Sequence, residues 1–255
     1  MYDSFIFRGR PLEDFGAEAF WGESYTVGAQ IRRPAYNLPA GGSVLIGADV
    51  PETRTHNLTL LPAPGVADTP AWRRNLLQWL QGARGELVWR EDPEMVRLAR
   101  FDKTGSGGQK VSPEGGITLQ ATLEPLCRTR QESGAGGTTQ GKKLTLVMPA
   151  ETGVRAPLRI VLESSGTLTG ATVKTASGTL KVAGMRLSAG KTIEYYAGDA
   201  HGNPASLMVN GAAGYGYLES GQWGILTAET GEEITITTTG AEAGVHVYAR
   251  GWWVD

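Results

Sequence analysis

Residues 233–250 read EITITTTGAEAGVHVYAR, and this stretch decides the fold class of the second half of the chain. Apolar and polar side chains alternate strictly at 233–237 and again at 245–250. Successive side chains of a β-strand point to opposite faces of a sheet, so this alternation predicts two strands that each turn one face to a core.

The same kind of pattern extends backwards through the rest of the second half. Short strand-like runs alternate with turns that contain glycine or asparagine, and no helical periodicity interrupts them. The further strands that we expect lie at 143–148, 157–163, 171–175, 179–183, 192–196, 206–209 and 224–226, and the last strand is expected to run from 245 to 254. Many short strands without helices predict a two-sheet β-sandwich of the jelly-roll kind.

A small, polar, glycine-rich stretch, QESGAGGTTQG at 131–141, precedes this β-rich half. Such a composition is typical of a flexible linker, and 255 residues suit two domains. We therefore expect a first domain at 1–132, a linker at 133–142 and a second domain at 143–255.

The first half contains one convincing helix, at residues 70–81. Thr69 can cap its start, and Pro70 suits the first helical position because the missing N–H costs nothing there. Trp72, Leu76, Trp79 and Leu80 form one apolar stripe, which we expect to pack on a sheet. Gly82 is placed to end the helix through a left-handed cap.

The other elements of the first half are predicted strands at 5–7, 58–60, 86–89, 96–101 and 117–123. The fold class is therefore mainly β: a sandwich-like N-terminal domain with one α-helix, followed by a β-sandwich. Between Arg33 and His56 lies a long polar stretch rich in proline and glycine, which indicates a functional loop or a hairpin arm. The residues that we expect at a subunit interface on this arm are Pro39, Gly41, Gly42, Val44 and Ile46.

Charge and cysteine content argue against several classes of function. The net charge is −2 and the basic residues are scattered, so the chain lacks the dense cationic surface that nucleic-acid binding normally needs. The single cysteine, Cys127, cannot form an intrachain disulfide and is expected in the core. No apolar run is long enough to span a membrane, and the N-terminus does not resemble a signal peptide, so we expect the chain to fold in a cytoplasm.

No pattern in the sequence supports a catalytic, cofactor or metal site. The stretch GGTTQGK at 136–142 imitates a phosphate-binding loop, but Lys143 stands where the hydroxyl residue should be and a strand follows. The histidines lack metal-ligand spacing. Asp199 and His201 could form an acid–base pair of a hydrolase, although their surroundings favour an ordinary β-turn.

Aromatic side chains are the one ligand signal of the second domain. Trp252 and Trp253 are adjacent, so in a regular strand one of them faces outwards. The candidate contacts with a glycan or a protein partner are Tyr217, Trp223, Trp252 and Trp253. These residues leave open an alternative function, a carbohydrate-binding module that recognises cell-surface glycans.

Several stretches, taken in order, resemble the distal tail proteins of siphophages and related prophages (Dit-like tail components). They are MYDSFIFRG at 1–9, LPAGGSVL at 38–45, LLQWL at 76–80, LVWREDP at 87–93, VRLAR at 96–100, and GITLQA at 116–121 followed by EPL at 124–126. The second domain, through GEEITI at 231–236 and VHVYAR at 245–250, is similar to the galectin-like or carbohydrate-module-like sandwich often fused to that family.

This resemblance implies a structural hub rather than an enzyme. Members of the family form a homohexameric ring, single or paired with a second ring, at the distal end of the tail tube. The ring joins the tube protein to tail-associated lysins, fibres or receptor-binding proteins, and its channel passes DNA. The expected location is therefore the virion tail tip, with cell-wall glycan as a further candidate partner.

Overall fold

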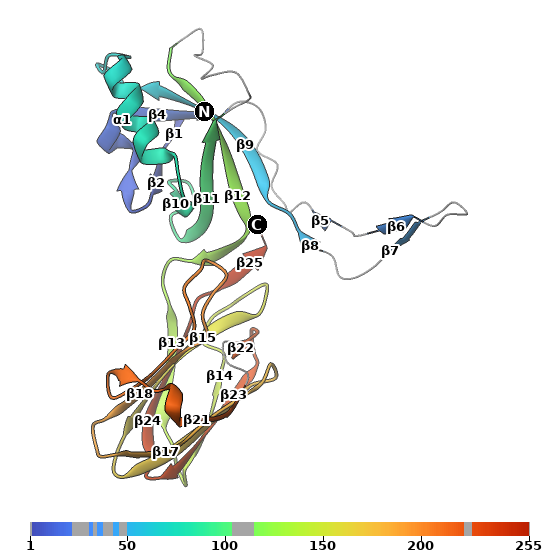
Figure 1. Cartoon of the computed structure of the whole chain (residues 1–255), viewed down its shortest axis with the longest axis vertical. Helices are drawn as coiled ribbons and strands as arrows, with labels where there is room; N and C mark the ends of the chain where they lie inside the picture. Colours follow the sequence, from blue (N-terminus) through green and yellow to red (C-terminus); the bar gives the residue numbers. More distant parts are fainter. Residues whose placement is uncertain are drawn as a thin grey trace. The chain divides into compact units, whose positions relative to one another are not determined.

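The structure is a computed structural model that describes residues 2–21, 31–32, 35–37, 43–45, 50–103, 115–221 and 226–254. It divides into two compact units, Met1–Arg130 with Val254–Asp255, and Gln131–Trp253. Figure 1 shows that strands dominate both units and that the first carries the helix α1 (Pro70–Leu80). The predicted fold class, mainly β with one α-helix, is confirmed.

The strands of the first unit's sheet are β1 (Tyr2–Asp3), β2 (Phe5–Phe7), β3 (Arg10–Pro11), β4 (Ala17–Trp21), β9 (Arg54–Pro62), β10 (Gly85–Trp89), β11 (Met95–Lys103) and β12 (Ile117–Thr129). They pair in the order β1-β4-β9-β12-β11-β10-β2-β3. Every pair in this order is antiparallel.

This sheet must curl, because its connectivity does not fit a flat one. Strands β3 and β4 are joined only by the 3₁₀ helix η1 (Leu12–Phe15) and Gly16, a span of about 20 Å at most. In the sheet order, however, they lie six strand positions apart, which would be about 29 Å in a flat sheet. The curl brings the two ends of the sheet together and gives the sandwich-like domain that the sequence predicted.

Helix α1 forms where the sequence predicted it and by the expected local interactions. The Thr69 hydroxyl accepts a hydrogen bond from the backbone N–H of Trp72 at 3.1 Å, and Pro70 occupies the first turn. The end differs slightly from the prediction, because Gln81 turns extended while its N–H still bonds the Leu77 carbonyl. Gly82 follows with a positive φ of 115°, but the cap residue Gln81 is already extended, so the helix does not end in the left-handed cap that we expected.

The apolar stripe of α1 packs into an aromatic core, as predicted. The Trp79 ring stacks on Phe15 at 4.2 Å between centroids, and it also lies beside Phe5 at 6.0 Å and Phe7 at 6.1 Å. Its indole N–H donates to the Phe7 carbonyl at 3.3 Å. The indole N–H of Trp72 likewise donates to the Phe15 carbonyl at 2.9 Å, so both tryptophans place an apolar ring in the core and satisfy their polar atom.

The second unit is a sandwich of two antiparallel sheets. The first sheet contains β13 (Ser133–Thr138), β24 (Ala243–Ala249), β15 (Ala156–Ser164), β18 (Thr192–Tyr196), β19 (Ser206–Val209) and β20 (Ala212–Ala213) in that order, with β22 (Thr227–Ala228) paired to β15. The second sheet contains β14 (Lys143–Val147), β23 (Glu233–Gly240), β16 (Leu168–Lys174), β17 (Thr179–Leu187) and β21 (Leu218–Gly221). The 3₁₀ helix η2 (Tyr215–Tyr217) lies between β20 and β21.

The alternating stretch at 233–250 supplies one central strand to each sheet. In β23, Ile234 and Ile236 are fully buried, and in β24 the same is true of Val245 and Val247. The strand predicted to run on to 254 breaks after Ala249, and β25 (Trp252–Val254) begins after Gly251. A side-chain Cβ at Gly251 would lie 2.2 Å from the Trp253 ring, so the break requires glycine.

The predicted linker at 133–142 is wrong, because most of it is strand β13. Residues 133–138 pair along their whole length with β24, from Ser133 opposite Ala249 to Thr138 opposite Gly244. The glycines serve packing here, since a Cβ at Gly136 would lie 2.7 Å from the imidazole of His246. A glycine-rich strand keeps its backbone hydrogen bonds, so composition alone could not separate it from a linker.

Candidate interaction sites

The described residues of the stretch predicted to form an arm pair as two short ladders of a hairpin. Strand β5 (Ile31–Arg32) pairs with β8 (Val50–Pro51), and β6 (Ala35–Asn37) pairs with β7 (Ser43–Leu45), both antiparallel. Within the described part of the chain, these two ladders join none of the three larger sheets (Figure 1). The hairpin leads directly into β9, which begins at Arg54.

Few of the residues expected to make contacts on this hairpin are described. Val44 lies in β7, opposite Tyr36. The other four expected contacts, Pro39, Gly41, Gly42 and Ile46, lie outside the described residues. Their role at a subunit interface stays a prediction.

The aromatic residues predicted as contacts in the second unit differ in their exposure. Trp252 is 2% exposed and meets the His201 ring edge-on at 4.8 Å, so its assignment as a ligand contact is wrong. Both Trp252 and Trp253 were predicted as contacts because one of two adjacent strand residues faces outwards. The structure shows that Trp252 is the one that faces inwards. Trp253 is half-buried, Tyr217 on η2 is exposed, and Trp223 lies outside the described residues.

An outward-facing cluster that the sequence did not reveal lies on β15 and β24. The Arg159 guanidinium stacks over the Tyr248 ring at 4.1 Å and donates to Glu132 at 2.7 Å and Glu194 at 3.4 Å. The hydrogen bond to Glu132 is the main reason that the pKa of Arg159 is raised above its ordinary value. Arg159 therefore covers one face of the Tyr248 ring and links it to two carboxylates, one of which, Glu132, directly precedes β13.

The Asp199–His201 pair forms a turn, as the sequence favoured. The Asp199 carboxylate accepts hydrogen bonds from the Tyr196 hydroxyl at 2.6 Å and from the side-chain amide of Asn203 at 2.7 Å. Burial raises the pKa of Asp199, but these hydrogen bonds outweigh it, so the pKa is lowered overall. The carboxylate is thus engaged in holding the turn, which gives no support to the hydrolase hypothesis.

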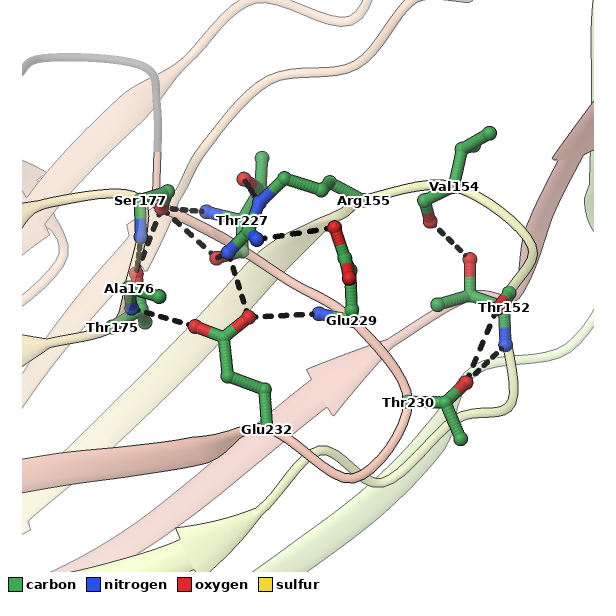
Figure 2. Close-up of polar contacts among 10 residues, drawn as sticks. All are labelled: Thr152, Val154, Arg155, Thr175, Ala176, Ser177, Thr227, Glu229, Thr230 and Glu232. Carbon is green, nitrogen blue, oxygen red and sulfur yellow. Dashed lines mark hydrogen bonds and ion pairs between the residues drawn. The ribbon is translucent and has the colours of Figure 1, made fainter.

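A polar network joins three loops at one end of the sandwich (Figure 2). Arg155 donates to Glu232 at 2.7 Å, to Glu229 at 3.2 Å and to the carbonyl of Thr227 at 3.1 Å. The other carboxylate oxygen of Glu232 accepts the backbone N–H of Ala176 at 2.6 Å. Both oxygens of Glu232 are therefore used, and the network holds the three loops together.

The protonation of Glu232 is tuned by the same contacts. Burial raises the pKa of Glu232, but hydrogen bonds from the backbone N–H groups of Ala176 and Glu229, together with the charge of Arg155, outweigh burial. The pKa of Glu232 therefore lies below its ordinary value. The ion pair is present at neutral pH, and acid should loosen these loops.

No group of three or more histidine, cysteine or carboxylate side chains is arranged to hold a metal ion in the part of the chain that the structure describes. Among the described helices, none is long and apolar enough to cross a membrane.

Comparison with known proteins identifies the fold. No protein-family model and no curated protein sequence matches the chain. Among solved structures, the crystal structure of the SPP1 Dit (gp 19.1) protein, described as a paradigm of the hub adsorption apparatus in phages infecting Gram-positive bacteria, is similar with a TM-score of 0.68. The identity is 11%, and the match covers 99% of each chain.

A second solved structure supports the same conclusion. A chain of the phage P2 baseplate in its activated conformation with Ca is similar with a TM-score of 0.50 at 9% identity, covering 96% of this chain and 98% of that one. The likeness extends through both units, because neither match is confined to one of them. This chain therefore has, over its whole length, the fold of a Dit-like phage tail component.

Proposed function

We propose that this protein is a structural hub at the distal end of a phage or prophage-derived tail. The observation that carries the proposal is the match to a hub protein over 99% of both chains, which includes both units in the same order. A fold alone can host many functions. Here, however, the match extends to a two-unit arrangement rather than to one common sandwich.

In this role the first unit would form a homohexameric ring, and the hairpin at residues 31–51 would contact the neighbouring subunit. The ring would join the tail tube protein to tail-tip, fibre or lysin proteins, and it would reside at the tip of the virion. The net charge of −2 suits this role, since a channel that passes DNA should not hold phosphates.

A non-enzymatic role also agrees with the chemistry of the described side chains. Glu232 accepts hydrogen bonds from two backbone N–H groups and from Arg155. Asp199, the one acid considered for catalysis, is held by Tyr196 and Asn203. Both carboxylates are therefore engaged in holding loops.

The test of the ring is the molar mass in solution. Six copies of the 27.1 kDa chain give about 163 kDa by size-exclusion chromatography with light scattering. A variant in which residues 35–45 are replaced by a short glycine–serine turn should fall apart into smaller species, while Tyr217→Ala should keep the full mass. A wild-type chain that stays monomeric at high concentration would count against the ring. A hairpin replacement that keeps the hexamer would count against the role of the hairpin.

One observation keeps the carbohydrate-binding alternative open to test. Tyr215 and Tyr217 are 53% and 38% exposed on the single turn η2, and exposed tyrosine rings can stack on sugars. A glycan array with the full-length protein and with a Tyr215→Ser/Tyr217→Ser variant decides the matter. Binding that the double variant removes would support the alternative, whereas a blank array would end it.

A further inference from the structure

The first unit contains a hollow of about 360 Å³ that neither the ring nor the hairpin explains. Phe5 and Trp89 also line it, and their rings pack edge to face at 5.6 Å between centroids in the core, on the other face of β2 and β10. Both side chains are almost fully buried, at 1% and 5% exposure, so the core fixes the two strands that carry the hollow. The volume lies in the range of protein ligand pockets, about 300–1,000 Å³.

Apolar side chains from separate segments form the walls. Ile6 and Val88 are direct cross-strand partners on β2 and β10, and both are half-buried. Pro11 on β3 and Pro93 in the turn before β11 also line the hollow. Aliphatic walls of this kind favour a large apolar side chain, and an aromatic one can also stack against a guanidinium group.

The rim of the hollow is mainly cationic. Arg90 and Arg130 both line it and both are exposed. One carboxylate, Glu13, also lines it, and that side chain accepts the hydroxyl of Ser4 at 2.5 Å. A ligand would therefore meet two guanidinium groups and one hydrogen-bond acceptor around an apolar centre.

We propose that this hollow binds a segment of another protein in which a large apolar, preferably aromatic, side chain is flanked by carboxylates. The apolar side chain would fill the hollow, its flanking carboxylates would pair with Arg90 and Arg130, and a backbone N–H of the segment could donate to Glu13. Arginine suits this role because its planar group bonds carboxylates with two parallel hydrogen bonds. The inference does not depend on the ring, since it concerns one unit of one chain.

Three synthetic peptides, identical except at their centres, test the chemistry. Asp-Trp-Asp carries both features, Asp-Ala-Asp lacks the ring and Lys-Trp-Lys reverses the charge. Fluorescence anisotropy with labelled peptides should show Asp-Trp-Asp binding at least roughly tenfold more tightly than either of the others. Equal binding of all three peptides, or no binding of Asp-Trp-Asp at millimolar concentration, would overturn the proposal.

Variants then locate the binding site. Arg90→Glu should weaken Asp-Trp-Asp binding by roughly tenfold and reduce the salt dependence of binding. Val88→Asp should also weaken binding by roughly tenfold, because it places a carboxylate in the apolar wall. Arg74→Glu, on the exposed side of α1, is the matched control and should leave binding unchanged. Equal effects of the changes at Arg90 and Arg74 would place the peptide elsewhere and refute the assignment.

Light scattering on the Arg90→Glu variant separates this site from self-assembly. The variant should keep the molar mass of the wild-type protein, whatever that mass is. A loss of mass would mean that the hollow is occupied by a second copy of this chain, which contradicts the proposal for a different protein. Failure of the ring itself would appear in the wild-type protein and would leave the peptide result unaffected.

Discussion

Truncation of Trp79 to alanine should destabilise the first unit and leave the second unchanged. The Trp79 side chain is 9% exposed and is the one ring of α1 that contacts Phe5, Phe7 and Phe15 together. Phe15 belongs to η1, the short connection that brings the two ends of the sheet together. The substitution therefore removes the contact between the helix and the point where the sheet closes.

The size of the effect follows from what is lost. Burial of a tryptophan side chain removes roughly 150–250 Å² from water, worth about 4–6 kcal/mol at about 25 cal/mol per Å². The unfolded chain already buries part of this area, so about 3–5 kcal/mol of unfolding free energy is the realistic loss. Trp79→Phe keeps a ring but loses the hydrogen bond to the Phe7 carbonyl, so it should cost about 1–2 kcal/mol.

The single cysteine provides an assay that reports on the first unit alone. Cys127 lies in β12 and is 2% exposed, so a thiol reagent reaches it only when this unit opens. Pulsed thiol labelling across a urea series therefore gives the unfolding midpoint of the first unit without interference from the second. Gln78→Ala, exposed on the same helix, is the matched control and should change stability by about 0.5 kcal/mol or less.

One result would refute the reasoning about the aromatic core. If Trp79→Ala shifts the labelling midpoint no more than Gln78→Ala does, α1 does not stabilise the sheet through this ring. If Trp79→Phe is as damaging as Trp79→Ala, the hydrogen bond rather than the stacked ring dominates. Either outcome would require a different account of how the curled sheet is held closed.

Two further substitutions test the loops. Gly116→Ala should cost clearly more unfolding free energy than Gly65→Ala in the same labelling assay. Both residues have a φ of 85°, which disfavours alanine equally. Only at Gly116, however, would the new Cβ meet the Leu60 carbonyl oxygen, at 2.2 Å. Equal costs would mean that the backbone moves aside. Glu232→Gln should destabilise the second unit at neutral pH. The difference in unfolding free energy between this variant and the wild-type protein should vanish as the pH falls from about 4.5, the ordinary pKa of glutamate, through the lowered pKa of Glu232 in the folded protein. Hydrogen exchange of the β23 amides measures this difference, with Glu229→Gln as the more exposed control, and a difference that persists in acid would show that the charge of Glu232 is not what matters.

Local sequence signals correctly predicted the helices and strands that are determined by interactions between residues close together in the chain. Thr69, Pro70 and the spacing of Trp72 and Trp79 sufficed to place α1, because capping and helical periodicity act within a few turns. Strands β18 and β19 were placed residue for residue, since alternation there is bounded by turn residues. The burial of Cys127 was also predicted, and the structure confirms it.

The errors occurred where a contact from a distant part of the chain decides the outcome. Strand β13 looks like a linker because Gly134 and Gly136 carry no side chain, and the reason for them lies in Tyr248 and His246 on β24. The sequence gives no sign that each glycine and its partner on β24 are neighbours, because they lie more than one hundred residues apart in the chain. Trp252 was misassigned for a related reason, since alternation shows that one of two adjacent residues is buried but not which.

The hollow of the first unit could not have been predicted from the sequence. Its lining comes from the start of β2, from β3 and η1, from the end of β10 and its following turn, and from Arg130 at the end of the unit. Strands β2, β3 and β10 meet because they pair directly with one another, and η1 adds Glu13 because it begins the five-residue connection from β3 to β4. The contribution of η1 therefore depends on the closure of the sheet, and a substitution that opens the sheet at Trp79 should also weaken binding of the Asp-Trp-Asp peptide. If Trp79→Phe lowers stability but leaves peptide affinity intact, the hollow is shaped by the paired strands alone and does not depend on the closure of the sheet.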